Sequence, residues 1–531
     1  MTLSRKADGR AALLLAAIAS AGMLALAMPG RIGWWPLLFI ALVPLLLITL
    51  SARPGRSGLG GFVFGLVYHL ALLYWILIVL GRYGGLPLGF SLPALFLLAA
   101  YMACFPAAFC WLLSLLAGRS RRREQPVASL VWIAPVLWVG FEYLRSILLT
   151  GFPWMDLGYG LFSQSWLIQA ADLGGHHLIS FSLVLANGLV VAIIDRQRGD
   201  GRRSWRRERG LLLAAVVFLA AVGGYSLVRS QTVAAMAARS TPARVAVVQG
   251  NIDQAIKWSP ATREATVTTY LNLSQQVVRE AATHLVVWPE TALPFYPQKD
   301  PLIHRVTDFA TANATWLLTG APLYTITSQA DGADRVRYWN GAILIGPEGR
   351  VSGQYAKQHL VPFGEYVPLR RFLPFLQPLV VNIDDFSAGT ETGPLTLGPM
   401  RLGMLICYES IFPGIARESV RQGANLLVNI TNDAWYGRSS APYQSMAMAV
   451  FRAVENKRAL IRAANTGISG FIDPLGRITG QTDIFTEAAQ VAQVPMLDLL
   501  TLFNLGGSRF GMVCALLMPL LLLFSYRRRQ G

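Results

Sequence analysis

Three short segments of the sequence carry residue types that could together perform covalent acyl chemistry. Glu290 lies in VVWPETALP, Lys357 in YAKQHLVPFGEYVP and Cys407 in GMLICYES. A cysteine needs a base or a lowered pKa to attack a carbonyl at neutral pH, because a free thiol is only slightly ionised. A buried carboxylate could accept the proton, and an ammonium could stabilise the developing oxyanion. We therefore predict that Glu290, Lys357 and Cys407 form a catalytic set.

Each of these residues also has an ordinary structural interpretation. A cysteine in an apolar strand is usually an inert, small hydrophobic residue, and a lone glutamate or lysine is usually a solvated surface group. Histidine is the more usual base for a cysteine, yet none of the six histidines lies in a recognisable catalytic motif, although His359 is close to Lys357. The catalytic interpretation therefore depends on the three segments occurring together.

The segment from about 236 to 500 reads as alternating strands and helices, which predicts an α/β domain. Apolar runs such as HLVVWPETA and ANLLVNITNDAW end in polar or turn-forming residues, and helix-like stretches such as QSMAMAVFRAVENKRALIRAAN separate several of them. Glu290, Cys407, Asn432 and Asp433 stand at strand ends. Active-site residues are commonly placed there, since ligands of such sheets bind outside the carboxyl ends of the strands.

The whole chain is too apolar for an ordinary soluble enzyme. Of its 531 residues 53% are hydrophobic and 14% charged, and the mean hydropathy is +0.44, which indicates a polytopic membrane protein. The net charge of +17 would suit nucleic-acid binding, but the arginines cluster in short loops beside apolar runs, so we predict no nucleic-acid partner. Four cysteines without paired spacing favour neither disulfides nor a zinc site, and no cofactor is predicted.

Eight apolar runs are long enough to cross a bilayer, which takes about 20 residues. We therefore predict eight transmembrane helices, with residues 1–235 as a seven-span domain, 236–500 as the catalytic domain, and 501–531 as a last span with a basic tail. The first run could instead be a secretory signal, but its apolar core is longer than is usual for one. The runs lie at about 11–28, 34–50, 60–81, 92–117, 127–148, 166–194, 210–228 and 510–526.

Arginine placement predicts the orientation of these spans. With eight spans the arginine-rich segments all fall on one side, and the opposite loops hold only isolated arginines such as Arg31 and Arg82. Because basic loops stay in the cytoplasm, the catalytic domain is predicted to lie outside it. The arginine-rich segments are 5–10, 53–56, 119–123, 196–209 and 527–529.

Several motifs resemble those of known families. The glutamate of WPE, the lysine before GEYVP and the cysteine of CYE resemble the Glu-Lys-Cys triad of the nitrilase (carbon-nitrogen hydrolase) superfamily. The chain as a whole resembles the bacterial apolipoprotein N-acyltransferase family, and the likeness extends to TGFPWMDLGYG, NIDQAIKW and TNDAWYG. The resemblance implies an αββα sandwich on a multi-span anchor in the bacterial inner membrane, with the catalytic domain facing the periplasm.

The same resemblance implies a two-step reaction. Glu290 would deprotonate Cys407, which would take an acyl chain from a phospholipid donor as a thioester, while Lys357 stabilises the oxyanion. The α-amino group of a diacylglyceryl-modified apolipoprotein would then accept the chain as an amide. No metal or cofactor enters this scheme.

Three further residues are implied to support the triad. Glu365 should lie beside Lys357 and hold its charge and orientation, although it could be an ordinary loop glutamate. Tyr408 and Glu409 should shape the pocket next to the nucleophile. Plain packing is the alternative for both, and it is almost as good an interpretation for Tyr408.

Three aromatic residues are also candidates for substrate handling. Trp258 lies where the family has a tryptophan linked to the substrate, but an aromatic near a membrane is commonly an interfacial anchor. Trp435 and Tyr436 resemble parts of a mobile loop over the cleft, or else buried aromatics at a strand end.

Ionisable residues in the membrane half are functional candidates by default. Glu142 and Arg145 lie three apart, close enough to pair on one helix face, where they could equally be a structural ion pair. The sequence leaves their roles open, together with those of Asp172, His176 and His177.

Two other classes of protein could carry parts of this pattern. A membrane-tethered nitrilase-like amidase would use the same triad and hydrolyse its acyl-enzyme with water, but it would gain nothing obvious from eight spans. A transporter or channel with an outer receptor domain often has internal repeats and interrupted polar helices, which this sequence lacks. Both are weaker interpretations than acyl transfer.

Overall fold

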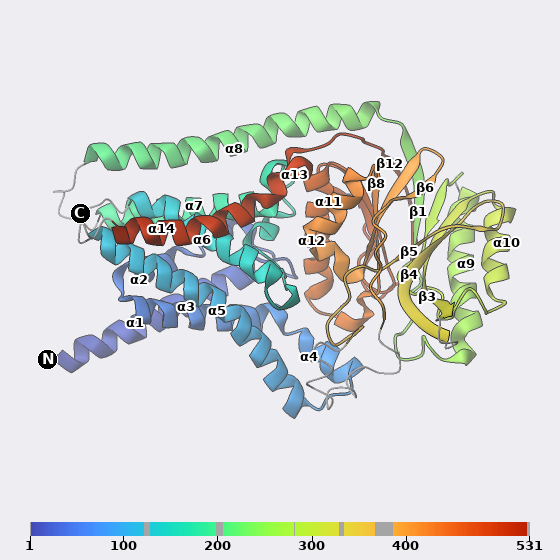
Figure 1. Ribbon diagram of the computed structural model, residues 1–531, viewed down its shortest axis with the longest axis horizontal. Helices are drawn as coiled ribbons and strands as arrows, with labels where there is room; N and C mark the ends of the chain where they lie inside the picture. The colour runs from blue at the N-terminus through green and yellow to red at the C-terminus, as the bar shows by residue number, and fades with distance from the viewer. Residues whose placement is uncertain are drawn as a thin grey trace. The chain divides into compact units, whose positions relative to one another are not determined.

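The computed structural model describes residues 2–121, 128–197, 205–280, 282–328, 334–366 and 386–527. The chain forms two compact units (Figure 1). The first comprises residues 1–77, 88–230 and 505–531, and the second comprises 78–87 and 231–504. Each unit is described by itself below.

The first unit is helical because its sequence consists of long apolar runs. Six helices among the described residues are long and apolar enough to cross a membrane, which supports insertion of this unit into a bilayer. The helices are α1 (Thr2–Ala27), α2 (Val43–Ser51), α3 (Pro54–Leu73), α4 (Ile76–Ile78), α5 (Leu88–Arg121), α6 (Ala128–Ile147), α7 (Ala171–Gln197), α8 (Trp205–Arg239), which continues into the second unit, and α14 (Phe510–Arg527).

The predicted number of eight spans is not confirmed, since the described residues contain six such helices. The run at 34–50 is broken by Pro36 and Pro44 into a short 3-10 turn and the nine-residue helix α2. Proline cannot donate the backbone hydrogen bond that a continuous helix requires, and nine residues reach only about 14 Å. The run at 510–526 forms an apolar helix that is also shorter than the other six.

The orientation of the membrane helices stays a prediction. The arginine-rich segments 119–123, 196–209 and 527–529 fall in part outside the described residues.

The second unit contains two six-stranded sheets, which agrees with the predicted α/β class. The strand order is β12-β1-β2-β3-β4-β5 in one sheet and β11-β10-β9-β8-β7-β6 in the other. The strands are β1 (Pro242–Gln249), β2 (Leu285–Val287), β3 (Trp316–Ser328), β4 (Asp334–Ile345), β5 (Val351–Ala356), β6 (Leu395–Leu397), β7 (Met400–Ile406), β8 (Leu426–Thr431), β9 (Ala459–Ala464), β10 (Gly470–Ile472), β11 (Ile478–Thr479) and β12 (Ala488–Pro495).

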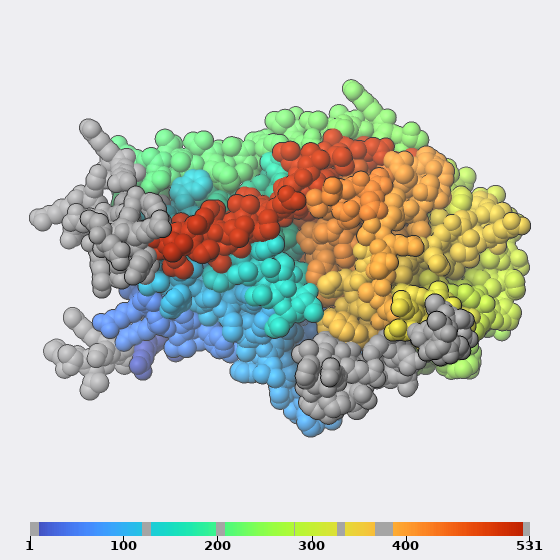
Figure 2. All heavy atoms as spheres, in the orientation of Figure 1, coloured from blue at the N-terminus to red at the C-terminus, as the bar shows by residue number. Residues whose placement is uncertain are grey.

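The two sheets pack face to face because side chains alternate across each strand. Val245 and Val247 of β1 belong to the same buried core as Met404 and Ile406 of β7. In Figure 2 the yellow and orange segments of this unit abut on the visible face. The inner faces of the sheets therefore form one apolar core.

Helices cover the outer face of each sheet (Figure 1). Val267 and Tyr270 of α9 share a second core with Ala246 of β1, which points outward between Val245 and Val247. On the other sheet, α11 contacts β7 and α12 contacts β9. The unit is thus a four-layer αββα sandwich. Its helices are α9 (Arg263–Glu280), α10 (Ile303–Ala312), α11 (Pro413–Arg421), α12 (Ala441–Asn456) and α13 (Leu502–Leu505).

Candidate active site

Cys407 directly follows β7, whose residues are buried in the sandwich core. Its backbone has a φ of +50° and begins a short 3-10 helix, Cys407–Ile411. A residue other than glycine pays a steric cost in this left-handed region, and such strain is common at functional sites. The sharp turn stops the strand and leaves Cys407 partly buried and packed against the core.

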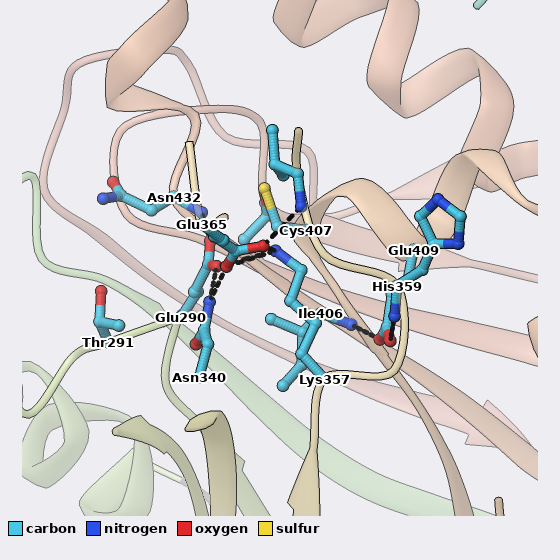
Figure 3. A network of polar contacts seen from close by, with 12 residues as sticks. Glu290, Thr291, Asn340, Lys357, His359, Glu365, Ile406, Cys407, Glu409 and Asn432 are labelled. Atoms are coloured by element: carbon cyan, nitrogen blue, oxygen red, sulfur yellow. Dashed lines mark hydrogen bonds and ion pairs between the residues drawn. The ribbon is translucent and has the colours of Figure 1, made fainter. Parts of the chain in front are cut away.

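Lys357 follows β5 in the opposite sheet, and its side chain is buried between two carboxylates. Its Nζ lies 2.9 Å from Glu365 Oε1 and 3.7 Å from Glu290 Oε1. Figure 3 shows the Cys407 side chain near these groups, with Glu409 and His359 to one side. Strand ends from both sheets thus bring the three residues of the predicted catalytic set together with Glu365.

Backbone and amide groups fix the two carboxylates in place. Asn340 on β4 donates from Nδ2 to Glu290 Oε1 and to Glu365 Oε1, both at 2.7 Å. The backbone N–H of Asn432, just after β8, donates to Glu290 Oε2 at 2.8 Å, and that of Val361 donates to Glu365 Oε2 at 2.8 Å. Glu290 is therefore held by groups from both sheets.

The charges around Cys407 disfavour a resting thiolate. Burial and the nearby Glu290 carboxylate raise the pKa of Cys407 to about 12, and Lys357 only partly opposes them. Burial alone would lower the pKa of Lys357, but the carboxylates of Glu365 and Glu290 outweigh it and raise this pKa above its ordinary value. The site therefore pairs a protonated thiol with a permanent cation, and it needs a base when the sulfur attacks.

Two family models match separate parts of the chain. Residues 244–499 match the carbon-nitrogen hydrolase model, and residues 20–189 match the N-terminal domain model of apolipoprotein N-acyltransferase. A Geobacter metallireducens protein named apolipoprotein N-acyltransferase is 42% identical over 97% of this chain and 96% of its own length. The chain belongs to the apolipoprotein N-acyltransferase family. A Pseudomonas putida protein of the same name is 35% identical over 95% of each chain.

The solved structures similar to this chain cover about half of it, with 48% for the first of them. Saccharomyces cerevisiae Nit3, described as a member of the nitrilase superfamily, is 20% identical and covers 48% of this chain and 90% of its own, with a TM-score of 0.37. The membership of the chain in the apolipoprotein N-acyltransferase family depends on the full-length relatives and not on this likeness.

Glu409 organises the segments that carry Lys357 and Cys407. Its buried carboxylate accepts hydrogen bonds from the backbone N–H groups of Ile406 at 2.7 Å and Gln358 at 2.6 Å, and from the Tyr355 hydroxyl. Burial raises the pKa of Glu409 to about 7, although these backbone donors oppose the shift. Glu409 thus connects the ends of β5 and β7 through these hydrogen bonds.

Tyr408 points into an aromatic cluster beside the site. Its ring lies 5.1 Å from Phe412 and 5.8 Å from His359, measured between centroids. Burial, followed by the nearby Lys357 charge, lowers the pKa of His359. These contacts agree with the packing interpretation of Tyr408, and a neutral His359 is a member of the same cluster.

The segment after β1 brings a second buried lysine to the end of β2. Lys257 Nζ lies 2.7 Å from Thr291 Oγ1 and 3.3 Å from the Glu290 backbone oxygen. Burial lowers its pKa to about 8, partly countered by Glu290. Lys257 therefore holds the backbone of the glutamate, and the adjacent Trp258, 39% exposed, borders a cavity.

Trp435 and Tyr436 lie on the short 3-10 helix Asp433–Tyr436 that follows β8. The Trp435 side chain is exposed, and its ring contacts Tyr83 of the second unit at 5.5 Å. Tyr436 lies within electrostatic reach of Cys407 and Glu290, and burial raises its pKa. Tyr436 therefore lies near the nucleophile, whereas motion of this segment stays a prediction.

Asp433 anchors this helix through a buried ion pair. Arg462 of β9 donates to Asp433 Oδ2 at 2.9 Å, and Thr431 donates to Asp433 Oδ1 at 2.8 Å. Asp433 is therefore a structural support for the strand end rather than a free carboxylate.

The ionisable residues of the first unit form a separate buried cluster. Arg145 pairs with Asp156, which also lies 2.9 Å from His176 Nε2. Ligand atoms of Asp156, His176 and His177 lie within 4.8 Å of one another, as in a metal site. The Arg145 guanidinium already neutralises Asp156, however, and this disfavours a cation there.

The two acidic residues of this unit singled out from the sequence have partners of their own. Glu142 accepts hydrogen bonds from Trp138 Nε1 at 2.9 Å and from the Leu157 backbone at 2.8 Å. Asp172 pairs with Arg229 at 2.6 Å. These contacts support a structural role in holding the helices together.

Sequence reasoning missed Asn340 and Lys257 as components of the site. Asn340 occurs in the middle of RYWNGAILIG, which reads as an ordinary strand, and only its pairing opposite Pro322 of β3 brings it to the carboxylates. Lys257 directly precedes Trp258 in the motif IKW. Its place in that motif could have marked it as a component of the site.

Proposed function

We propose that Glu290, Lys357 and Cys407 perform the acyl transfer for which this family is named, through a thioester on Cys407. The observation that carries the proposal is the arrangement of Lys357 Nζ between the carboxylates of Glu365 and Glu290, beside the only thiol of this unit among the described residues. A nucleophile, a base and a cation are the parts that covalent acyl transfer needs.

In the first step the Cys407 sulfur attacks an ester carbonyl of a phospholipid. Glu290 accepts the thiol proton as the carbon–sulfur bond forms, which is required because the raised pKa of Cys407 leaves little thiolate. The Lys357 ammonium stabilises the oxyanion of the tetrahedral intermediate. The intermediate collapses as Glu290 returns the proton to the departing lysophospholipid oxygen, and the acyl chain remains on sulfur.

In the second step the α-amino group of a diacylglyceryl-modified apolipoprotein attacks the thioester. Glu290 takes a proton from the amine and returns it to the sulfur, so that an amide and free Cys407 result. The first product, lysophospholipid, leaves before the second substrate, the apolipoprotein, reacts. The kinetics should therefore be ping-pong. Glu365 holds Lys357 and Asn340 holds Glu290 in position through both steps.

We further propose that the chain works in the bacterial inner membrane with the second unit facing the periplasm. The apolar helices of the first unit support membrane insertion, and the arginine-rich loops support this orientation. The functional division would then be a membrane domain at 1–235, a catalytic domain at 236–500 and a C-terminal span with a basic tail at 501–531.

A product assay tests the proposal. The full-length protein in mixed micelles is incubated with a phospholipid and a synthetic diacylglyceryl-cysteine peptide, and the peptide is analysed by mass spectrometry. We expect an N-acylated peptide, and no product from a matched peptide with an acetylated α-amine. Release of free fatty acid without acylated peptide would instead identify a hydrolase that uses water as the acceptor.

A further inference from the structure

A cavity of about 480 Å³ lies in the second unit beside the proposed active site. Its volume is in the range of small-molecule binding sites, roughly 300 to 1,000 Å³. Aromatic side chains supply much of its wall, namely Trp258, Tyr296, Tyr338 and Phe386. Neither the triad nor its supporting hydrogen bonds account for this cavity.

The cavity wall continues into the segments that hold the catalytic carboxylates. Tyr338 lies two residues before Asn340 on β4, so both side chains lie on the same face of the strand. The backbone N–H of Phe386 donates to the Glu365 carbonyl at 3.1 Å. A molecule in the cavity would therefore lie next to the hydrogen-bond network of Glu290 and Glu365.

The charged residues of the cavity carry a net positive charge. Arg263 and Lys299 line it together with a single carboxylate, Asp300. Arg263 is only loosely paired, because its closest atom lies 3.6 Å from Asp300 and its buried Nε has no hydrogen-bond partner among the described residues. Lys299 Nζ lies 4.5 Å from the centre of the Tyr324 ring, which leaves its N–H donors available.

Two structural features strengthen the attraction for an anion. Asp300 Oδ1 already accepts a hydrogen bond from the Leu302 backbone N–H at 3.0 Å, just before α10. This bond partly neutralises the carboxylate and weakens its repulsion of an anion. Arg263 opens the 18-residue helix α9, and the positive end of the helix dipole adds to its charge.

We propose that this cavity binds the phosphate ester of the acyl donor's head group. The inference rests on the proposed function, in which a phospholipid is the donor. Arginine matches a phosphate with parallel hydrogen bonds, and lysine adds a point charge. The α-amino group of the acceptor is unsuited to the same place, because two cations would repel it in its ammonium form. The cavity therefore favours the phospholipid donor over the acceptor, and the lysophospholipid product leaves it after the acyl chain is transferred.

The test measures acylation of Cys407 in a single turnover of the full-length protein with two donors. One is dioleoyl phosphatidylethanolamine in mixed micelles, and the other is p-nitrophenyl butyrate, which has no phosphate. Arg263→Gln and Lys299→Gln should each lower the rate at subsaturating phospholipid about tenfold more than the rate with the neutral ester, because each removes a charge-assisted contact. The matched control Arg305→Gln, on neighbouring α10 and outside the cavity lining, should change neither rate.

Competition experiments distinguish a lipid head group from free phosphate. Lysophosphatidylethanolamine should inhibit acylation by the phospholipid at concentrations where inorganic phosphate has no effect. Equal inhibition by inorganic phosphate would overturn the assignment to the lipid. If the wild type is acylated, then equal losses of acylation rate with both donors in the variants, or no loss, would overturn the cavity's role. A wild type that takes no acyl group from phospholipid would instead contradict the proposed function itself.

Discussion

Replacement of Glu290 by glutamine should change two reactions of Cys407 in opposite directions. The carboxylate of Glu290 helps to raise the pKa of the thiol, second only to burial. Removing its negative charge should lower this pKa and increase the thiolate fraction, so alkylation by iodoacetamide should become faster. Acyl transfer should become much slower, because the base that accepts the thiol proton is lost.

The magnitude follows from the pKa of about 12. The thiolate fraction falls tenfold for each pH unit below the pKa, so at pH 7 it is about one part in 100,000, against about three in 100 for a free cysteine. Wild-type Cys407 should therefore react with iodoacetamide roughly three thousandfold more slowly than an exposed thiol. The rate should rise about tenfold per pH unit from pH 7 to 10, because the protonated form persists up to the raised pKa.

Intact-mass measurement of the carbamidomethyl adduct provides the assay. An exposed reference thiol can be introduced on the same domain by Ser352→Cys, and Glu280→Gln serves as a matched control because Glu280 is a surface carboxylate. We expect Glu290→Gln to accelerate alkylation of Cys407 several-fold and Glu280→Gln to have no effect. A rate that is already constant near neutral pH, or slower alkylation in Glu290→Gln, would refute the account of the thiol's electrostatics.

Three further predictions concern other parts of the molecule. Lys357→Met should lower single-turnover acylation by about a hundredfold or more, since it removes the oxyanion's cation; acylation at the wild-type rate would exclude that role. Lys257 has a pKa lowered from 10.5 to about 8, so the wild type binds fewer protons when folded than when unfolded between these values, and its melting temperature should rise with pH there relative to Lys257→Met. Parallel melting curves, followed by tryptophan fluorescence, would contradict this burial effect. In intact cells an impermeant maleimide should label Ser352→Cys, in a background without Cys104 and Cys407, and labelling only after lysis would contradict the periplasmic orientation.

The α/β class of the second unit could be predicted because its signals are local. The apolar run LGMLIC ends at a polar segment, and the structure places Cys407 at the end of β7 as that pattern indicates. The same holds for Glu290 after β2 and Lys357 after β5. What strand ends cannot reveal is which of them meet, because that depends on how the two sheets pack.

Other features were not predicted. Some depend on strand pairing or on contacts between distant segments, and one depends on prolines that a count of apolar residues ignores. Asn340 occupies an ordinary strand position and acts on the carboxylates only through the pairing of β3 with β4. Hydropathy counted the run at 34–50 as a span, although Pro36 and Pro44 interrupt its helix. Likewise, Arg145 pairs with Asp156 from a later loop, a partner that helical spacing to Glu142 could not indicate.

The most direct test of the central claim is the mass of the protein after incubation with phospholipid alone. Without an acceptor the reaction should stop at the acyl-enzyme, so the intact mass should increase by one acyl chain on Cys407. Hydroxylamine should remove this adduct, and Cys407→Ala should never form it. Wild-type levels of lipoprotein acylation by Cys407→Ala would contradict the thioester mechanism.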